Sequence, residues 1–106
     1  MNPTDWDTIT RLVAWLDDHS SGDPEMGKVM RCLKIMEEGG EVAEALSGAR
    51  SQNPRKGNSH TWEDVESELC DVIMTAMVAL LTINPEGEKT WRRRLEAVAE
   101  RSLSHT

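Results

Sequence analysis

The sequence lacks the features that would place it in several large protein classes. None of its apolar runs approaches the roughly 20 residues that span a bilayer, and its first residues, MNPTDWDTIT, do not follow the charged-then-apolar order of a secretion signal. Tandem repeats and low-complexity segments are also missing. We therefore expect a single globular domain over residues 1–106, located in the cytoplasm and without a membrane partner.

Cysteine is scarce, since Cys32 and Cys70 are the two that the chain contains. Neither belongs to a CxxC pair, and each lies within an apolar pattern typical of a helix. Isolated cysteines in such patterns behave as small hydrophobic side chains. We predict two buried free thiols.

Positive charge is also in short supply. The chain has 12 basic and 19 acidic side chains, which gives a formal net charge of −7. Nucleic acids and anionic lipids are polyanions, so this balance disfavours a nucleic-acid polymer as a partner. Three of the 12 basic residues lie between positions 47 and 60, where positive charge is locally concentrated.

Alternating patterns and hairpin turns, the marks of strands, are missing as well, and helical periodicity dominates. Asp23 before Pro24 predicts the start of a second helix, and Thr61 with Asp64 resembles the capping box of a third. The segment 47–60 is rich in Gly, Ser, Asn and Pro and is predicted as a loop. The expected fold is all-α, with helices over about 4–19, 24–47, 61–83 and 86–102.

The third predicted helix is apolar on nearly every side. After Asp71 it reads VIMTAMVALLTI, in which threonine is the only polar type. Such a helix has to be covered all round, and four short helices cover it poorly. We expect a second subunit to complete the helical core, in a homodimer or homotetramer.

Acidic residues are grouped on the second and third helices. At about 100° per residue, Glu37, Glu38 and Glu41 fall within an arc of about 100° that has apolar residues on both sides. Glu68 and Asp71 are neighbours on one face of the third helix. Like charges brought together in a partly buried site repel one another unless a divalent cation joins them. Carboxylate oxygens without His or Cys partners favour Mg²⁺, or Mn²⁺, over zinc.

Solvated surface charge and a di-iron centre are the alternatives to a magnesium site at these acidic residues. Pairs of glutamates three apart are common on solvated helix faces, so surface charge alone accounts for the same pattern. A ferritin-like di-iron site requires Glu-x-x-His pairs, and none of His19, His60 and His105 follows a glutamate by three residues. The di-iron interpretation is therefore excluded.

Gly39 and Gly40 lie inside the acidic segment of the second helix. Each glycine costs on the order of 1 kcal/mol in a helix interior. Their lack of side chains would let another helix or a ligand approach the backbone between the carboxylates. The alternative is a break in the helix at this point.

These acidic motifs resemble a known family. EEGGE (Glu37, Glu38, Glu41), followed after the loop by ELCD (Glu68, Asp71), is similar to the ExxE…ExxD signature of the MazG-like nucleoside triphosphate pyrophosphohydrolases, in the all-α NTP pyrophosphatase superfamily. The similarity covers residues 28 to about 83. It implies Mg²⁺-dependent hydrolysis of a nucleoside triphosphate to the monophosphate and pyrophosphate, by dimers or tetramers built on a helical core.

The resemblance also implies roles for individual residues. Glu38, Glu41, Glu68 and Asp71 match the family's metal ligands, and Glu37 matches an additional acid that binds metal or activates water, so Glu37 and Glu38 are the catalytic candidates. The base-recognition region has no clear counterpart in this chain, and the expected substrate is therefore a nucleoside triphosphate of undefined base.

Basic residues near the acidic motifs are candidates for phosphate binding. Lys34 precedes the first motif by one turn, and Arg55, Lys56 and His60 lie just before the third helix, whose N-terminus also favours anions. Solvated side chains are the alternative for all four. Trp62 either stacks on a base or packs as core. If the acidic residues bind no substrate, the protein is instead a non-catalytic acidic helical module that regulates a partner.

Overall fold

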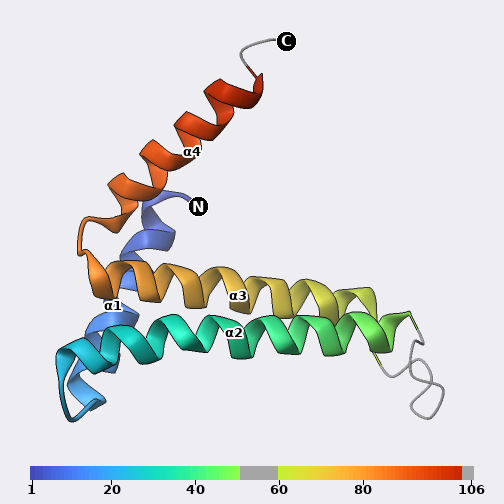
Figure 1. The fold of residues 1–106 in the computed structure, drawn as a ribbon, viewed down its shortest axis with the longest axis horizontal. Helices are drawn as coiled ribbons and strands as arrows, with labels where there is room; N and C mark the ends of the chain where they lie inside the picture. Colours follow the sequence, from blue (N-terminus) through green and yellow to red (C-terminus); the bar gives the residue numbers. More distant parts are fainter. Residues whose placement is uncertain (51–59, 104–106) are drawn as a thin grey trace.

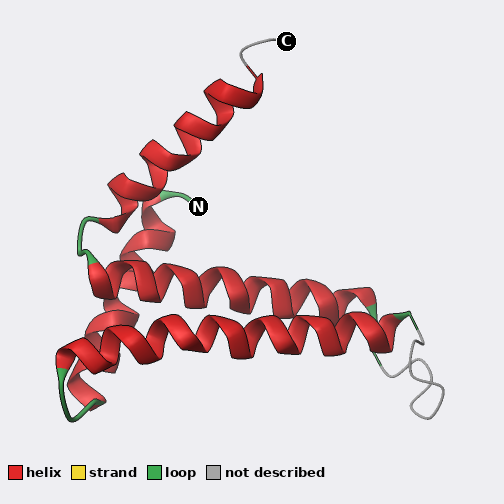
Figure 2. Cartoon of the chain, in the orientation of Figure 1, coloured by secondary structure: helices red, strands yellow, loops and turns green. Residues whose placement is uncertain are grey.

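The chain folds into four α-helices in a computed structural model that describes residues 1–50 and 60–103 (Figures 1 and 2). No strand occurs among these residues, so the predicted all-α fold is confirmed. The helices are α1 (Pro3–His19), α2 (Pro24–Ala49), α3 (Trp62–Ile83) and α4 (Gly87–Leu103).

Side-chain caps define where the first three helices begin. The Thr61 hydroxyl accepts the Asp64 N–H at 3.2 Å while the Asp64 carboxylate accepts the Thr61 N–H at 2.9 Å, which confirms the predicted capping box. Asp23 accepts the Glu25 N–H at 3.0 Å and confirms the start of α2. Sequence reasoning missed a second capping box, formed by Asn2 and Asp5 at the start of α1.

The hairpin of α2 and α3 forms the long axis of the molecule (Figure 1). The two helices lie side by side and run in opposite directions, so residues near the end of α2 face residues near the start of α3. Helix α1 lies across the other end of the hairpin, where α2 begins and α3 ends. Helix α4 leaves from this same end and points away from the hairpin.

The hydrophobic core lies where α1 crosses α3. Trp6 and Ile9 pack there against Met77 and Leu81, each with at most 6% of its surface exposed. Partly buried side chains surround this group: Val13, Val78, Leu80 and Trp91. Burial of these apolar side chains, each contributing on the order of 2 kcal/mol, fixes α1 against the hairpin.

Two further contacts hold this end together. Arg31 of α2 donates to Asp17 of α1 at 2.8 Å and to the Thr82 hydroxyl of α3 at 3.0 Å, and so joins three helices. At the turn into α4, a Cβ atom on Gly87 would lie 2.8 Å from Leu80 Cγ. Only glycine allows α4 to begin this close to α3.

Some predictions about burial were wrong. Both cysteines are free, but Cys70 is exposed and Cys32 only half-buried, because a cysteine in a helical pattern is buried only where another element covers its face. Trp15 is 56% exposed in the single chain and stacks on His19 with ring centroids 4.5 Å apart, so it lies outside the hydrophobic core.

The single chain is not compact. Its radius of gyration is 16.9 Å, whereas a compact domain of this length has about 13 Å. Exposed apolar side chains remain along α3, including Leu69, Ile73 and Met74, so α3 is not covered on every side within one chain. Among the described helices, none is both long and apolar enough to cross a bilayer.

Candidate metal centre

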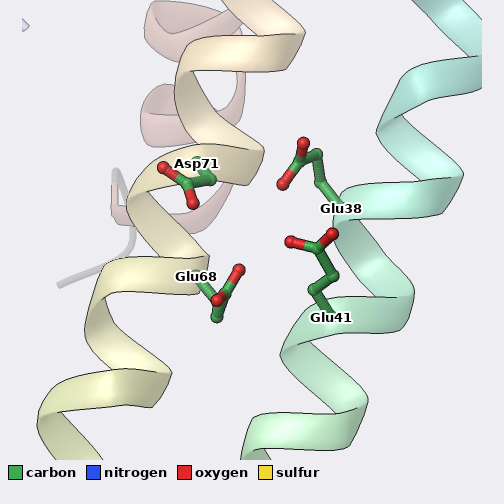
Figure 3. A group of neighbouring side chains, drawn as sticks. All are labelled: Glu38, Glu41, Glu68 and Asp71. Carbon is green, nitrogen blue, oxygen red and sulfur yellow. The ribbon is translucent and has the colours of Figure 1, made fainter.

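Four carboxylates meet between α2 and α3, as the sequence predicted for a metal site (Figure 3). Glu38 and Glu41 are three residues apart and lie on one face of α2. Glu68 and Asp71 have the same spacing on α3, and the antiparallel hairpin places them opposite the first pair. Helical periodicity accounts for each pair, and the packing of α2 on α3 brings the pairs together.

The carboxylates are close enough to hold one cation. A ligand oxygen of each residue lies within 4.8 Å of those of the other three. Oxygen ligands at 2.0–2.6 Å from a central Mg²⁺ or Ca²⁺ are at most about 4–5 Å apart, so the four oxygens fit around one ion. With only carboxylate oxygens, the group suits a hard cation.

Burial within the cluster is uneven. Glu38 is buried, with 9% of its surface exposed, Glu68 and Asp71 are half-buried, and Glu41 is exposed. The Oε2 atom of Glu68 is buried without a hydrogen-bond partner in the part of the chain that the structure describes. A buried carboxylate oxygen without a donor is costly, and a cation at this point would remove the cost.

The crowding of negative charge shows in the pKa of Glu41. This pKa is raised above its ordinary value of 4.5, first by a hydrogen bond with the Glu68 carboxyl and then by partial desolvation. Repulsion from Glu68, Glu37 and Asp71 raises the pKa further. The folded protein therefore holds these acids together at an electrostatic cost.

Lys34 lies at the edge of the cluster. Its Nζ atom is 3.5 Å from Glu38 Oε1 and 3.8 Å from Glu37 Oε2. Lys34 partly offsets the charge of the buried Glu38 and remains half-exposed, so its ammonium group is accessible from solvent. Phosphate binding by Lys34 stays a prediction.

Glu37 is not part of the group of four. Its side chain is largely exposed and pairs with Lys34, although its charge is near enough to raise the pKa of Glu41. The sequence placed Glu37, Glu38 and Glu41 on one acidic arc, and the structure separates them. Glu38 and Glu41 point at α3, whereas Glu37 lies at the border with solvent.

The two glycines do not interrupt α2. The helix runs without a break through Gly39 and Gly40, so the alternative of a helix break was wrong. A Cβ atom on either glycine would have no neighbour within 4 Å. Within one chain, therefore, nothing described approaches the backbone that these glycines leave bare.

Two of the other four predicted substrate-binding residues, His60 and Trp62, lie where α3 begins. Arg55 and Lys56 fall outside the described residues. His60 is half-buried just before the Thr61 cap, and Trp62, at the first position of α3, is largely exposed. The expectation of Trp62 as core is therefore wrong within the single chain.

Sequence reasoning missed a hollow beside Trp62. Leu46, Ser47, Arg50 and Trp62 line this shallow hollow, which is largely open to solvent and lies between the end of α2 and the start of α3. Along the helices, Trp62 is six residues from Glu68 and Leu46 is five from Glu41, or about 8–9 Å at 1.5 Å per residue. The signal available was Arg50, the first of the three basic residues in the segment 47–60.

Comparison of the chain with protein-family models, with curated proteins and with solved structures finds no match in any of the three. The class of protein therefore has to be argued from the site itself.

Proposed function

We propose that this protein is a Mg²⁺-dependent nucleoside triphosphate pyrophosphohydrolase of the MazG-like type, with Mn²⁺ as a substitute cation. The proposal rests on one observation, the convergence of four carboxylates from two antiparallel helices, of which Glu68 has a buried oxygen without a hydrogen-bond partner among the described residues. The order of the motifs, ExxE on α2 and ExxD on α3, is the further support from resemblance.

The chemistry follows from the charge of the substrate. A nucleoside triphosphate resists attack because its oxygens repel a nucleophile. A cation held by Glu38, Glu41, Glu68 and Asp71 would supply charge neutralisation and lower the pKa of a bound water. Without a cation the site repels the substrate, since four carboxylates face it.

Residues at the border of the cluster take the remaining roles in this proposal. Glu37, which is exposed and next to the four ligands, accepts the proton of the attacking water. The buried carboxylate of Glu38 helps Glu37 to activate this water, in addition to binding the cation. Lys34 contacts a phosphate oxygen. Arg55 and Lys56 add positive charge from the connection between α2 and α3, His60 contacts a phosphate oxygen, and Trp62 contacts the base.

A homo-oligomer is the proposed active form, as a dimer or tetramer. Apolar side chains stay exposed along α3 within one chain, and the radius of gyration exceeds that of a compact domain by about 4 Å. A second copy would cover this surface.

The test is a panel of ribo- and deoxyribonucleoside triphosphates, with released pyrophosphate as the readout and Mg²⁺, Mn²⁺ or a chelator added. We expect pyrophosphate from at least one nucleotide with Mg²⁺ and none with the chelator. Mg²⁺ alone should also raise the melting temperature, because it binds only the folded cluster. Absence of both effects would exclude the proposal.

The second candidate is a non-catalytic acidic helical module that regulates a partner. The open surface of the chain and its excess of negative charge favour it. In that case Mg²⁺ leaves the melting temperature unchanged, and no nucleotide releases pyrophosphate. The same panel therefore separates the two functions.

A further inference from the structure

Helix α4 is held by its own chain through its first turns. Gly87 lies against Leu80 and Leu81, and Trp91 packs on the core. Further along, Leu95 is 50% exposed and Leu103 is 62% exposed. Figure 1 shows α4 leading away from the hairpin, in keeping with the exposure of Leu95 and Leu103, while Val98 between them is half-buried.

Helix α2 has an uncovered apolar face of its own, directed away from α3. Five side chains between 49% and 75% exposed form this face, and they recur at helical spacing: Met26, Val29, Met30, Leu33 and Met36. On the helix they lie opposite Glu38 and Ala45, which are buried toward α3. The stripe continues into Gly40, where the surrounding space is open.

Charge decides which helix of a second copy fits this face. Helix α2 carries five acidic and three basic residues, α3 five acidic and none basic, and α1 four acidic and one basic. Helix α4 carries three acidic and five basic residues, and is alone among the four in having net positive charge. An α2 or α3 helix from another copy would meet like charge on α2, whereas α4 meets opposite charge.

The dimensions agree as well. The 17 residues of α4 extend about 25 Å, and the α2 face from Met26 to Gly40 extends about 21 Å at 1.5 Å per residue. On α4, Arg94 and Arg101 are seven residues apart beside the stripe of Leu95 and Val98. Exposed carboxylates of Glu25 and Glu37 border the α2 face.

We propose that α4 of one copy packs along the exposed α2 face of a second copy, and that the exchange is reciprocal in a two-fold symmetric dimer. Leu95 and Val98 then cover Leu33 and Met36, with Arg94 and Arg101 beside the acidic border. This inference rests on the proposed assembly and is independent of the proposed hydrolysis.

Disulfide trapping tests the pairing. In full-length protein carrying Cys32→Ser and Cys70→Ser, one preparation receives Leu33→Cys and a second receives Leu95→Cys. After mixing, subunit exchange and mild oxidation, we expect a cross-linked dimer that needs both cysteines. Glu100→Cys, on the opposite side of α4, replaces Leu95→Cys in the control and should cross-link at least fivefold less.

A charge variant gives an independent measurement. By sedimentation, Arg94→Glu should raise the dimer dissociation constant at least about fivefold, whereas Arg93→Glu, on the other side of α4, should leave it nearly unchanged. A wild-type monomer at all concentrations would overturn the proposal, as would cross-linking of Leu33→Cys with itself alone or equal effects of the two arginine variants. No activity is measured, so these outcomes leave the hydrolase proposal to its own test.

Discussion

The two ends of the α2–α3 hairpin differ in the interactions that their side chains make. At the end where α2 begins and α3 ends, apolar side chains and the Arg31 bridge hold three helices together. Toward the other end, where α2 ends and α3 begins, four carboxylates face one another, and a buried oxygen of Glu68 has no donor among the described residues. The contacts at the first end stabilise the fold. The repulsion between carboxylates near the second end destabilises it, and a bound cation would remove that repulsion. Substitutions in the core should therefore lower the free energy of unfolding, whereas substitutions that remove a carboxylate of the cluster should not.

The largest effect on stability should come from substitutions in the hydrophobic core, where α1 crosses α3. Trp6→Ala removes the largest side chain of the core and should lower the free energy of unfolding by about 3–5 kcal/mol. Trp15→Ala, at an exposed position of the same helix, should cost less than about 1 kcal/mol. Urea denaturation measures both. Equal losses would mean that the core does not lie where α1 crosses α3.

Substitutions in the acidic cluster should lower activity without lowering the stability of the metal-free protein. Asp71→Asn or Glu41→Gln should lower kcat/KM more than about a hundredfold, or about 2.7 kcal/mol of transition-state stabilisation, because each removes a ligand charge. The apo protein should hold or gain thermal stability, since repulsion is relieved. Glu66→Gln, an exposed glutamate of α3 outside the cluster, is the matched control. Wild-type kinetics in either ligand variant would contradict the assignment.

Substitution of Lys34 should lower both activity and stability. For the proposed nucleotide hydrolysis, Lys34→Met should lower kcat/KM about tenfold, or about 1.4 kcal/mol, because the proposed contact of Lys34 with a phosphate oxygen is lost. It should also lower the stability of the apo protein, because the buried Glu38 loses a cationic neighbour. Lys28→Met, which breaks an exposed pair with Glu25, serves as control. Steady-state kinetics and thermal unfolding without metal give the two readouts.

The smallest effect is in the pH dependence of the metal-free protein. Because the folded pKa of Glu41 is raised above 4.5, the charged carboxylate destabilises the fold at neutral pH, and protonation removes this penalty. Glu41→Gln should therefore be more stable than the wild type at pH 7. The difference should shrink as the pH falls through the raised pKa and vanish below 4.5. Thermal melts with a chelator from pH 7 to pH 4 test this; a constant difference would mean that Glu41 is not strained.

The sequence determined the helices and the composition of the site. Periodicity and the caps at Asp23 and Thr61 act within a few residues, so the helix ends could be predicted closely. The ExxE and ExxD spacings likewise placed each carboxylate pair on one face. The continuity of α2 through Gly39 and Gly40 was left open, because local propensity disfavours it and packing on α3 supports it.

Tertiary structure decided which carboxylates form the cluster and which side chains are buried, because both depend on the neighbours of each helix. Only the antiparallel packing of α2 on α3 selects Glu38 and Glu41 for the cluster and leaves Glu37 at its border. The exposure of Cys70, whose helical pattern predicted burial, depends likewise on which faces other helices cover, as does the exposure of Trp15. The direction of α4, fixed by the close contact of Gly87 with Leu80, left its later turns uncovered. Periodicity defines the faces of a helix, but burial, charge crowding and pKa are properties of distances between helices, and these arise only in the folded chain.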